Sequence, residues 1–399
     1  MPFCIVAYMK TSICSPPPSY VCKRENLVCK LHKSLYELKH ASRQWFAKFS
    51  QAILDAGYIQ SKADYSLLYK HKGITSVFIL VYVDDVIITG SDANEISTLK
   101  NFLRQRFKLK DSGNLKYFLG IEVSRSRRGI CLNQQQYALD IIKDEGLLGA
   151  KPAPFPMEEN LKLNNTDGNL LNNPASYRRL IGRLIYLTVT RPYILFSVNI
   201  LRQFMHQPRQ PHMKAAIRLV HYLKGSPGQC ILLSSHNELK LQAFYDSDWA
   251  SCPMTRRSTT GYCVFLGTSP ISWKTRKQPT ISKSSSEAEY RAMTLATCEL
   301  QWLWYLLQDL GVSHSFPSIL YCDDKDAIYI AANPVYHERT KHIEIDCHVV
   351  RERIQDGTLC TAFFPSKDQI GYIFTKALGK ETFLRLKSKL NLLDIHAPT

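Results

Sequence analysis

Two adjacent carboxylates interrupt an apolar stretch of the chain and could hold metal ions. Asp84 and Asp85 follow the apolar run 77–83, and apolar residues resume at Val86. An Asp–Asp pair in a turn is usually only a turn former, because Asp tolerates turn geometry and bonds its own backbone. On a rigid hairpin inside an apolar sheet, the same pair could bind the two divalent ions, about 4 Å apart, that phosphoryl transfer to a sugar hydroxyl requires.

Three more acidic residues stand at the ends of predicted elements in the second half of the chain. Asp246 and Asp323 each end a predicted strand, and Glu289 lies in the first turns of a long predicted helix. Alone, each is explained as a turn former or as a group that favours a helix start. Together they could supply hard oxygen ligands to two Mg²⁺ ions, of which one activates water and the other stabilises the leaving oxygen.

Neighbouring acids are alternatives at each of these three positions. Glu287 and Glu289 are two residues apart, so they point about 200° apart on a helix and only one can face the other acids. Asp248 and Asp324 are the alternatives at the two strand ends.

Hydrophobic spacing predicts the elements that would position these residues. An apolar run on both faces predicts an internal strand over 77–83, resuming at 86–88, and Gly57 is the expected end of a preceding helix. The other elements expected in this half are helices over 34–56, 96–107, 135–145, 177–189, 192–205 and 211–224, a hairpin over 117–132 turning at 127–129, and a polar linker over 151–174.

The second half of the chain has a different pattern after the glycines and proline at 225–228, which are typical of a boundary. Strands are expected at 239–244, 261–266 and 271–273, a long helix at about 286–310, and a strand at 319–322 followed by another helix. This order favours an α/β or α+β unit.

Length and charge limit the class of protein. The 399 residues exceed what one hydrophobic core usually serves, so two or three domains are expected. With 45% hydrophobic and 21% charged residues the chain is typical of folded proteins. A formal net charge of +17 favours a polyanionic partner such as nucleic acid, by a small margin, over a generally soluble basic protein.

Cysteine spacing and hydropathy predict the compartment. The 12 cysteines include no Cys-x-x-Cys pair, so a reduced intracellular compartment is the simplest account. No basic residue precedes the short apolar stretch 3–9, and no apolar run approaches the ~20 residues that cross a bilayer. We therefore expect an intracellular protein, cytoplasmic or nuclear, without a signal peptide or a transmembrane segment.

The residues around the first acidic pair resemble a known family. The stretch from Tyr82 to Asp85, between apolar strands, is similar to the catalytic palm hairpin of reverse transcriptases. Residues 27–36 and 41–45 resemble the segments that lead into the palm helix of copia-type (Ty1/copia) retrotransposon Pol polyproteins. The resemblance implies that Asp84 and Asp85 are catalytic metal ligands.

Two further stretches of the same resemblance imply contacts with nucleic acid. Residues 117–123 are similar to the primer-grip hairpin, in which the turn at Leu119 and Gly120 would lie against the primer backbone. Residues 180–184 are similar to the thumb helix that follows the duplex, which implies nucleic-acid binding by Gly182 and Arg183.

The second acidic group resembles the RNase H site of the same polyproteins. Residues 256–262, 271–274 and 333–343 are similar to the copia-type RNase H domain, in which a strand Asp, a helix Glu and a strand Asp hold Mg²⁺. The family pattern Ala-Glu-Tyr-x-Ala selects Glu289 over Glu287. The resemblance likewise selects Asp246 and Asp323 as catalytic metal ligands.

Over about 27–392 the resemblance implies a multidomain fold that combines α/β and α+β parts. We expect an irregular lead-in at 1–26, a partial reverse transcriptase palm at 27–95, a thumb and connection region at 96–228, and an RNase H-like α/β domain with a mixed sheet at 237–392. The implied activities are RNA-directed DNA synthesis and cleavage of RNA in RNA–DNA hybrids. The implied partners are Mg²⁺, a primer-template or RNA–DNA hybrid, and the upstream Pol segment.

Departures from the family pattern predict impaired chemistry. A two-metal polymerase needs a third palm carboxylate, yet no Asp precedes Asp55, so we expect a truncated palm without fingers and an inactive polymerase. Glu37 stands where the family has Gly, and Tyr193 where it has Asp. The alternatives to an enzyme are a non-catalytic protein that binds RNA–DNA hybrid and a functionless degenerate transposon product.

The RNase H pattern also departs in one place. Tyr372 stands where the family has the Asp that completes the carboxylate set, so we expect weak or absent hybrid cleavage. Asp368, four residues earlier, could partly substitute, but a helix-start role is favoured. The spacings of His337, His342 and His348 do not form a helical metal pair, and we expect structural or hybrid-facing roles.

Overall fold

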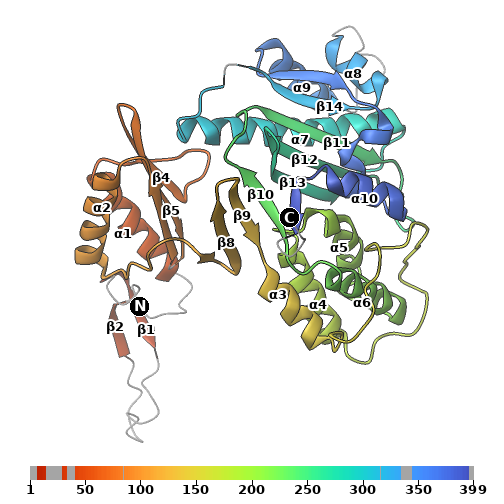
Figure 1. The fold of residues 1–399 in the computed structure, drawn as a ribbon, viewed down its shortest axis with the longest axis horizontal. Coiled ribbons are helices and arrows are strands. Elements are labelled where there is room, and N and C mark those ends of the chain that lie inside the picture. The colour runs from red at the N-terminus through yellow and green to blue at the C-terminus, as the bar shows by residue number, and fades with distance from the viewer. Residues whose placement is uncertain are drawn as a thin grey trace, which may run out of the picture. The chain divides into compact units, whose positions relative to one another are not determined.

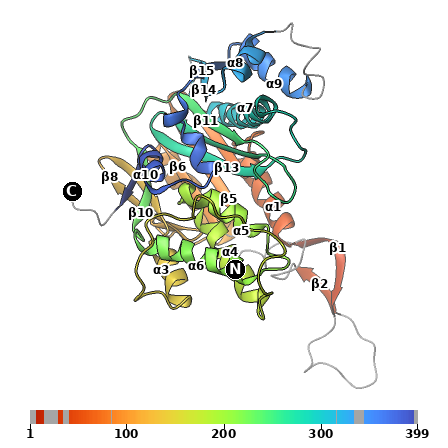
Figure 2. The ribbon, with the colours of Figure 1, turned by 90° about the vertical axis from the view of Figure 1, so that its right-hand side faces the viewer.

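The chain folds as two compact units. The computed structural model describes residues 7–14, 29–33, 41–83, 85–314, 316–333 and 344–394 (Figures 1 and 2). Residues 1–115 with 305–313 form the first unit, and residues 116–304 with 314–399 form the second. Nowhere in these described ranges is a helix both long enough and apolar enough to cross a membrane. The functional boundaries expected from sequence stay predictions.

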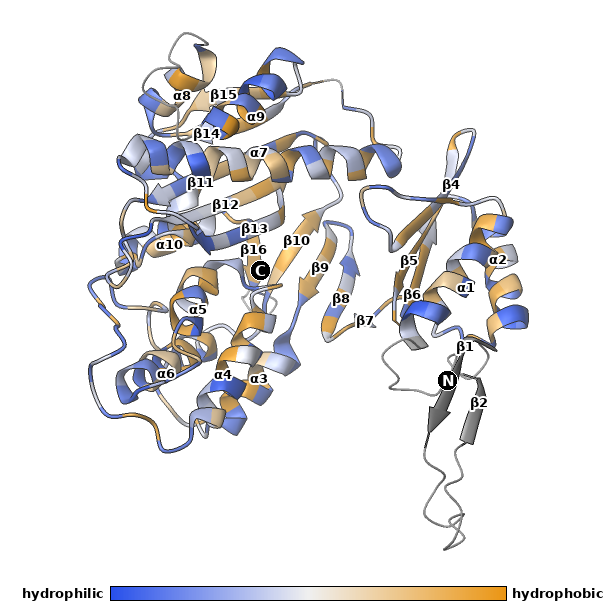
Figure 3. Cartoon of the chain, turned by 180° about the vertical axis from the view of Figure 1, so that it is seen from behind, coloured by the Kyte–Doolittle hydropathy of each residue, from blue (hydrophilic) through white to orange (hydrophobic). Residues whose placement is uncertain are grey.

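The first unit is built on a four-stranded antiparallel sheet. Its elements are α1 (Ala41–Asp55), β3 (Ile59–Gln60), β4 (Leu67–Lys72), β5 (Thr75–Tyr82), β6 (Asp85–Gly90) and α2 (Ala93–Phe107), preceded by the antiparallel pair β1 (Ala7–Cys14) and β2 (Cys29–Lys33). The strand order β3-β4-β5-β6 places β5 inside the sheet, which confirms the internal strand expected there. Val77, Ile79 and Val81 face a core shared with both helices, and Figure 3 shows the apolar colouring of β5.

One part of the second unit combines an antiparallel sheet with a helical bundle. Its elements are β7 (Tyr117–Phe118), β8 (Ile121–Ser126), β9 (Gly129–Asn133), α3 (Gln135–Asp144), α4 (Pro174–Leu187), η3 (Pro192–Ile194), α5 (Leu195–Arg202), α6 (Gln210–Lys224), β10 (Gln229–Ser234) and β16 (Leu392–Asp394). The strand order is β16-β10-β9-β8-β7. The segment expected to form a single hairpin forms three consecutive antiparallel strands, because the chain turns both at Leu119–Gly120 and at Arg127–Arg128.

Two expectations for this region need refinement. The glycines and proline at 225–228 do not end the compact unit, since β10 follows them directly and pairs with β9. Residues 151–173 contain neither a helix nor a regular strand, as expected for a linker. Met157 and Leu163 within them are nevertheless buried in the core of the helical bundle, so this stretch packs along its own unit.

The other part of the second unit is a five-stranded mixed sheet. Its elements are β11 (Leu241–Asp248), β12 (Thr259–Leu266), β13 (Ser269–Lys277), α7 (Ser285–Asp309), β14 (Ser318–Cys322), α8 (Lys325–Ala332), α9 (Glu344–Gln355), β15 (Leu359–Phe363), η6 (Ser366–Asp368), η7 (Ile370–Phe374) and α10 (Lys380–Ser388). The order is β13-β12-β11-β14-β15, in which β11 pairs antiparallel with β12 and parallel with β14. The mixed sheet expected from sequence is confirmed.

Candidate metal centre

Asp246 lies near the end of β11, where a glycine pair lets another segment lie flat on the sheet. Asp246 is opposite Gly261 of β12. A Cβ on Gly261 would lie 2.5 Å from Phe374, and a Cβ on Gly371 would lie 2.5 Å from the Tyr245 backbone. Because neither position has room for a side chain, η7 packs directly on β11 and β12 and brings the residues that follow it to Asp246.

Asp323 comes from the neighbouring parallel strand. It directly follows β14, and β14 pairs with β11 in parallel, so the ends of the two strands meet at one edge of the sheet. Asp324, the alternative at this position, caps α8 instead, since its Oδ1 accepts the backbone N–H groups of Asp326 and Ala327. This division of roles explains why adjacent acids have different surroundings.

Glu289 projects from the second turn of α7 toward β11. Its Oε1 accepts the backbone N–H of Ser247 at 3.0 Å. Glu287 points elsewhere, because it pairs with Arg291 at 2.7 Å and accepts the Lys283 backbone N–H at 2.7 Å. The structure therefore separates the two glutamates as the helical geometry predicted.

The three carboxylates form one cluster in the described part of the chain. Ligand oxygens of Asp246, Glu289 and Asp323 all lie within 4.8 Å of one another. Asp246 is 2% exposed and Glu289 is 8% exposed. Glu289 Oε2 has no hydrogen-bond partner, although it is buried. An orphaned carboxylate oxygen beside two other carboxylates fits a hard divalent cation such as Mg²⁺.

A cleft opens over this cluster. Its open space is about 330 Å³. Beyond the three carboxylates the lining residues are Ser285, Asp324, Lys325, Asp326, Tyr372 and Lys376. The acidic lining excludes an anion as the first ligand and favours a cation.

Three residues that follow Gly371 in the chain bind two of the three carboxylates through hydrogen bonds or an ion pair. The Thr375 hydroxyl donates to Asp246 Oδ2, and the Lys376 ammonium lies 3.4 Å from Asp246 Oδ1. The Tyr372 hydroxyl donates to Asp323 Oδ2 at 2.7 Å. The Lys376 ammonium also lies over the Tyr372 ring, 3.7 Å from its centroid. Sequence reasoning identified Tyr372 but missed Thr375 and Lys376, whose proximity to Asp246 depends on the close packing of η7.

Burial dominates the electrostatics of the cluster. It raises the pKa of Asp246 from 3.8 to about 6, against the opposing effects of Lys376 and Thr375. Burial, and then the charge of Asp246, raises the pKa of Glu289 well above its usual range. Acids whose negative charge is this poorly solvated gain most from a bound cation.

The first acidic pair is only partly covered by the described residues. Asp84 lies outside them. Asp85 begins β6, is exposed, and pairs with Tyr82 across the β5–β6 hairpin. Val83 has a φ of 49°, a left-handed conformation that is costly for a β-branched residue and marks a tight turn. Within the described residues of this unit, no three potential ligands gather as they do around Asp246.

Of the residues expected to bind nucleic acid, two form the turn between β7 and β8 and two lie on α4, the helix that this turn contacts. Leu119 and Gly120 form a turn with φ of 49° and 76°, and a Cβ on Gly120 would lie 3.3 Å from the Tyr186 ring on α4. Gly182 is exposed on the same helix. Arg183 is already engaged, since its guanidinium lies 2.6 Å from the Asp144 carboxylate.

Several other expectations have a clear structural outcome. Asp368 pairs with Lys389 at 2.7 Å and does not line the cleft, so it does not substitute for the acid missing at Tyr372. His348 is exposed on α9, whereas His337 and His342 lie outside the described residues. Glu37 lies outside them as well.

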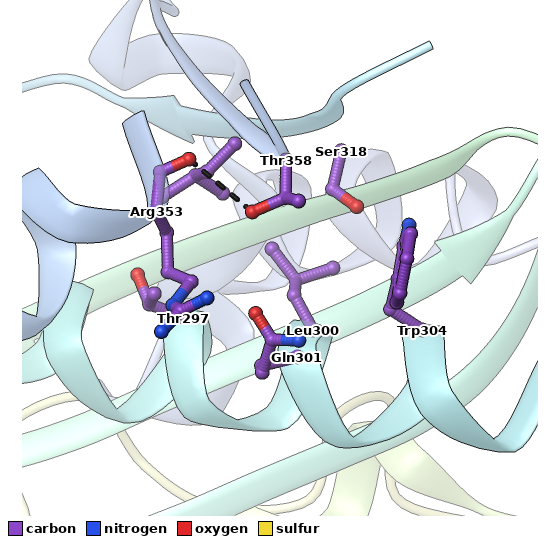
Figure 4. Close-up of a pocket in the computed structure, with 8 residues that line it drawn as sticks. Thr297, Leu300, Gln301, Trp304, Ser318, Arg353 and Thr358 are labelled. Carbon is purple, nitrogen blue, oxygen red and sulfur yellow. Dashed lines mark hydrogen bonds between the residues drawn. The ribbon is translucent and has the colours of Figure 1, made fainter. Parts of the chain in front are cut away.

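A second, smaller hollow lies farther along α7. Side chains of α7, α9 and the start of β14 and β15 surround it (Figure 4). Its polar residues are already bonded locally, as in the 3.2 Å hydrogen bond from the Thr358 hydroxyl to the Arg353 carbonyl. The residues that line it include no acid, His or Cys, so it is not a candidate metal centre.

Comparison with known proteins finds relatives among retrotransposon Pol polyproteins. The family model "Reverse transcriptase (RNA-dependent DNA polymerase)" matches residues 6–159. The retrovirus-related Pol polyprotein from transposon RE1 of Arabidopsis thaliana is 42% identical over 382 residues, which cover 96% of this chain and 26% of that protein. The Pol polyprotein from transposon TNT 1-94 of Nicotiana tabacum is 32% identical over 375 residues, covering 91% and 28%.

The relatives are matched over a small share of their length, and the likeness to solved structures is low. The chain spans about a quarter of the length of these relatives. Among solved structures, an RNase H domain of Mycobacterium tuberculosis, fused to maltose-binding protein, is similar over 38% of this chain and 97% of that chain. Its TM-score is 0.26 and its sequence identity 10%.

Proposed function

The chain belongs to the reverse transcriptase family of copia-type retrotransposon Pol polyproteins, and we propose that Asp246, Glu289 and Asp323 form a metal-dependent site that hydrolyses the RNA strand of an RNA–DNA hybrid. The observation that carries this proposal is the orphaned Glu289 Oε2 inside a cluster of three carboxylates. Evolution rarely leaves a buried carboxylate oxygen without a partner unless a ligand supplies one.

The chain's own residues prepare this site for a cation and a polyanion. The Ser247 N–H fixes the Glu289 carboxylate by its Oε1, which leaves the buried Oε2 without a hydrogen-bond partner. The Thr375 hydroxyl fixes the rotation of the Asp246 carboxylate in the same way. Mg²⁺ held by these oxygens would supply Lewis acidity for hydrolysis of a phosphodiester.

Basic residues near this edge of the sheet are available to bind phosphates. Arg256 and Arg257 are exposed in the loop that follows β11, and Lys274 and Arg276 are exposed on β13. Thr275 between them shares a sheet face with Asp246 through Gly261, so Lys274 and Arg276 project from the opposite face. Arg256 and Arg257, together with the formal charge of +17, therefore give the main support for a nucleic-acid substrate.

A cleavage assay tests the proposed hydrolysis. The full chain is incubated with a labelled RNA–DNA hybrid and with double-stranded RNA, in Mg²⁺ and in EDTA. We expect slow, Mg²⁺-dependent cleavage of the hybrid alone, abolished by Asp246→Asn and retained by Asp324→Asn. Equal cleavage by the wild type and Asp246→Asn would show that a contaminant is responsible and would contradict the proposal.

A non-catalytic hybrid-binding protein is the second candidate, and Tyr372 favours it. Its hydroxyl occupies Asp323 Oδ2 where the family pattern has a further carboxylate. If this substitution limits chemistry, Tyr372→Asp increases hybrid cleavage while the fold is retained. If cleavage stays absent but the hybrid binds with steep salt dependence, the second candidate is supported.

We also propose that the chain alone does not extend a primer. Support comes from the first unit, where Asp85 lies exposed at the start of β6 and no third described acid joins it. A primer-extension assay with a defined RNA template tests this directly. Template-dependent synthesis that is lost in Asp85→Asn would refute the proposal.

A further inference from the structure

The carboxylate cluster already contains one positive charge of the chain. The Lys376 ammonium lies 3.4 Å from Asp246 Oδ1, and the Lys376 side chain is 32% exposed. The Tyr372 ring lies beneath the same ammonium at 3.7 Å, a cation–π distance that holds the charge over the cluster.

Most carboxylate oxygens of the cluster are therefore already occupied by the chain. Asp246 receives Thr375 on one oxygen and Lys376 on the other. Asp323 Oδ2 receives the Tyr372 hydroxyl, and Glu289 Oε1 receives the Ser247 N–H. Any second divalent ion would compete with the Lys376 ammonium and the Tyr372 hydroxyl for these oxygens.

We infer that Lys376, anchored on the Tyr372 ring, takes the place of a second divalent cation, so that this cluster binds one divalent ion, on the side of Glu289 Oε2. Charge supports this count. The three clustered carboxylates and the Lys376 ammonium leave a net charge of −2, and Asp324, Asp326 and Lys325 in the lining of the same cleft add −1. One divalent ion removes most of this charge, whereas a second would reverse its sign at a desolvation cost.

The inference rests on the proposed function only for the choice of this cluster as the metal site. In this inference Lys376 and Tyr372 are positioning residues, because neither contacts a substrate. The inference also predicts two separate substitutions that would allow a second divalent cation to bind at the cluster. Lys376→Met removes the ammonium but keeps the bulk of the side chain. Tyr372→Asp removes the ring beneath the ammonium and adds a carboxylate.

Counting bound Mn²⁺ tests the inference without any substrate. The full chain is titrated with Mn²⁺ alone, and free ion is measured by electron paramagnetic resonance. We expect one ion per wild-type chain above weak background binding, two per chain for Lys376→Met and for Tyr372→Asp, and loss of the strong ion in Asp246→Asn. Tyr372→Phe keeps the ring beneath Lys376 and is the matched control, with one ion expected.

The possible results separate the two proposals. Two ions of similar affinity on the wild type would overturn the inference, and so would a single ion on both Lys376→Met and Tyr372→Asp chains that remain folded by circular dichroism. Failure of the hydrolysis proposal is a different result, namely hybrid cleavage that does not depend on Asp246. An ion count of one stands whether or not the hybrid is cleaved.

Discussion

Replacing Asp246 by Asn should stabilise the metal-free chain at neutral pH. The buried carboxyl has a folded-state pKa of about 6 against an ordinary value of 3.8. A difference of this size corresponds to about 3 kcal/mol of destabilisation once the group is ionised. The neutral amide can still accept the Thr375 hydroxyl, but its NH₂ group would face the Lys376 ammonium, which costs on the order of 1 kcal/mol. We therefore expect a net gain of about 2 kcal/mol at pH 7.

The sign of the pH dependence follows from the raised pKa. Below about pH 4 the carboxyl is protonated in both the folded and the unfolded chain, so the wild type carries no penalty. The penalty grows as pH rises toward the folded-state pKa and is complete above it. The penalty should thus be about half as large at pH 5 as at pH 7, so the net advantage of Asp246→Asn should fall to about a third.

Urea unfolding in EDTA, with Asp324→Asn as the control, measures this effect. Asp324 is the adjacent acid of the cleft, and Asn serves equally well as a helix N-cap, so that variant should change stability by less than about 0.5 kcal/mol. Adding Mg²⁺ should stabilise the wild type and reduce the difference, by about 2.7 kcal/mol when the ion is at 100 times its dissociation constant. The reasoning is refuted if Asp246→Asn is less stable than the wild type in EDTA at pH 7.

Three further predictions concern other residues of the second unit. Burial, then Arg191, lowers the pKa of Lys387 from 10.5 to about 8. The penalty for this charge is complete below about pH 8 and disappears above about pH 10.5. Lys387→Met should therefore raise the melting temperature at pH 7 and lose this advantage by about pH 11, and an equal effect at both would contradict it. Leu119→Gly should raise stability in urea by up to about 1 kcal/mol, because Leu119 has a φ of 49°; a loss would mean that its side-chain contacts outweigh the strain. Arg183→Ala should cost less than about 1 kcal/mol, since its partner Asp144 is largely exposed. The same variant should flatten the salt dependence of hybrid binding by about one phosphate contact, and an unchanged slope would exclude Arg183 from the interface.

Local features of the fold could be predicted where one helix or strand face carries the information. The spacing of Leu99, Leu103 and Phe107 predicted a helix, and all three are buried along α2. The two-residue spacing of Glu287 and Glu289 likewise predicted that the two side chains leave one helix in different directions. Such predictions succeed because periodicity within one element determines which side chains share a face.

Long-range packing could not be predicted in the same way. The contact of Gly371 with the Tyr245 backbone joins segments more than a hundred residues apart, and together with the contact of Gly261 with Phe374 it brings Thr375 and Lys376 to Asp246. β10 pairs with both β9 and β16, so a strand that was not predicted from the sequence, directly after the expected boundary at 225–228, completes a sheet begun earlier in the chain. No local periodicity encodes which distant segment lies across a glycine.

Two tyrosines show how a side chain without a charge packs at positions where the resemblance implies Asp. Tyr193 and Tyr372 both stand where the family pattern has Asp. Each hydroxyl bonds the polar group at its position, since Tyr193 accepts from the buried Arg191 at 2.9 Å and Tyr372 donates to Asp323 at 2.7 Å. Each ring also lies near a lysine ammonium, Lys387 or Lys376. The replacement thus exchanges a charge for a hydrogen bond and a cation–π contact, which preserves packing. A carboxylate at Tyr372 could ligate a metal ion, whereas a neutral phenol cannot do so comparably. Packing and metal binding therefore respond differently to the same substitution.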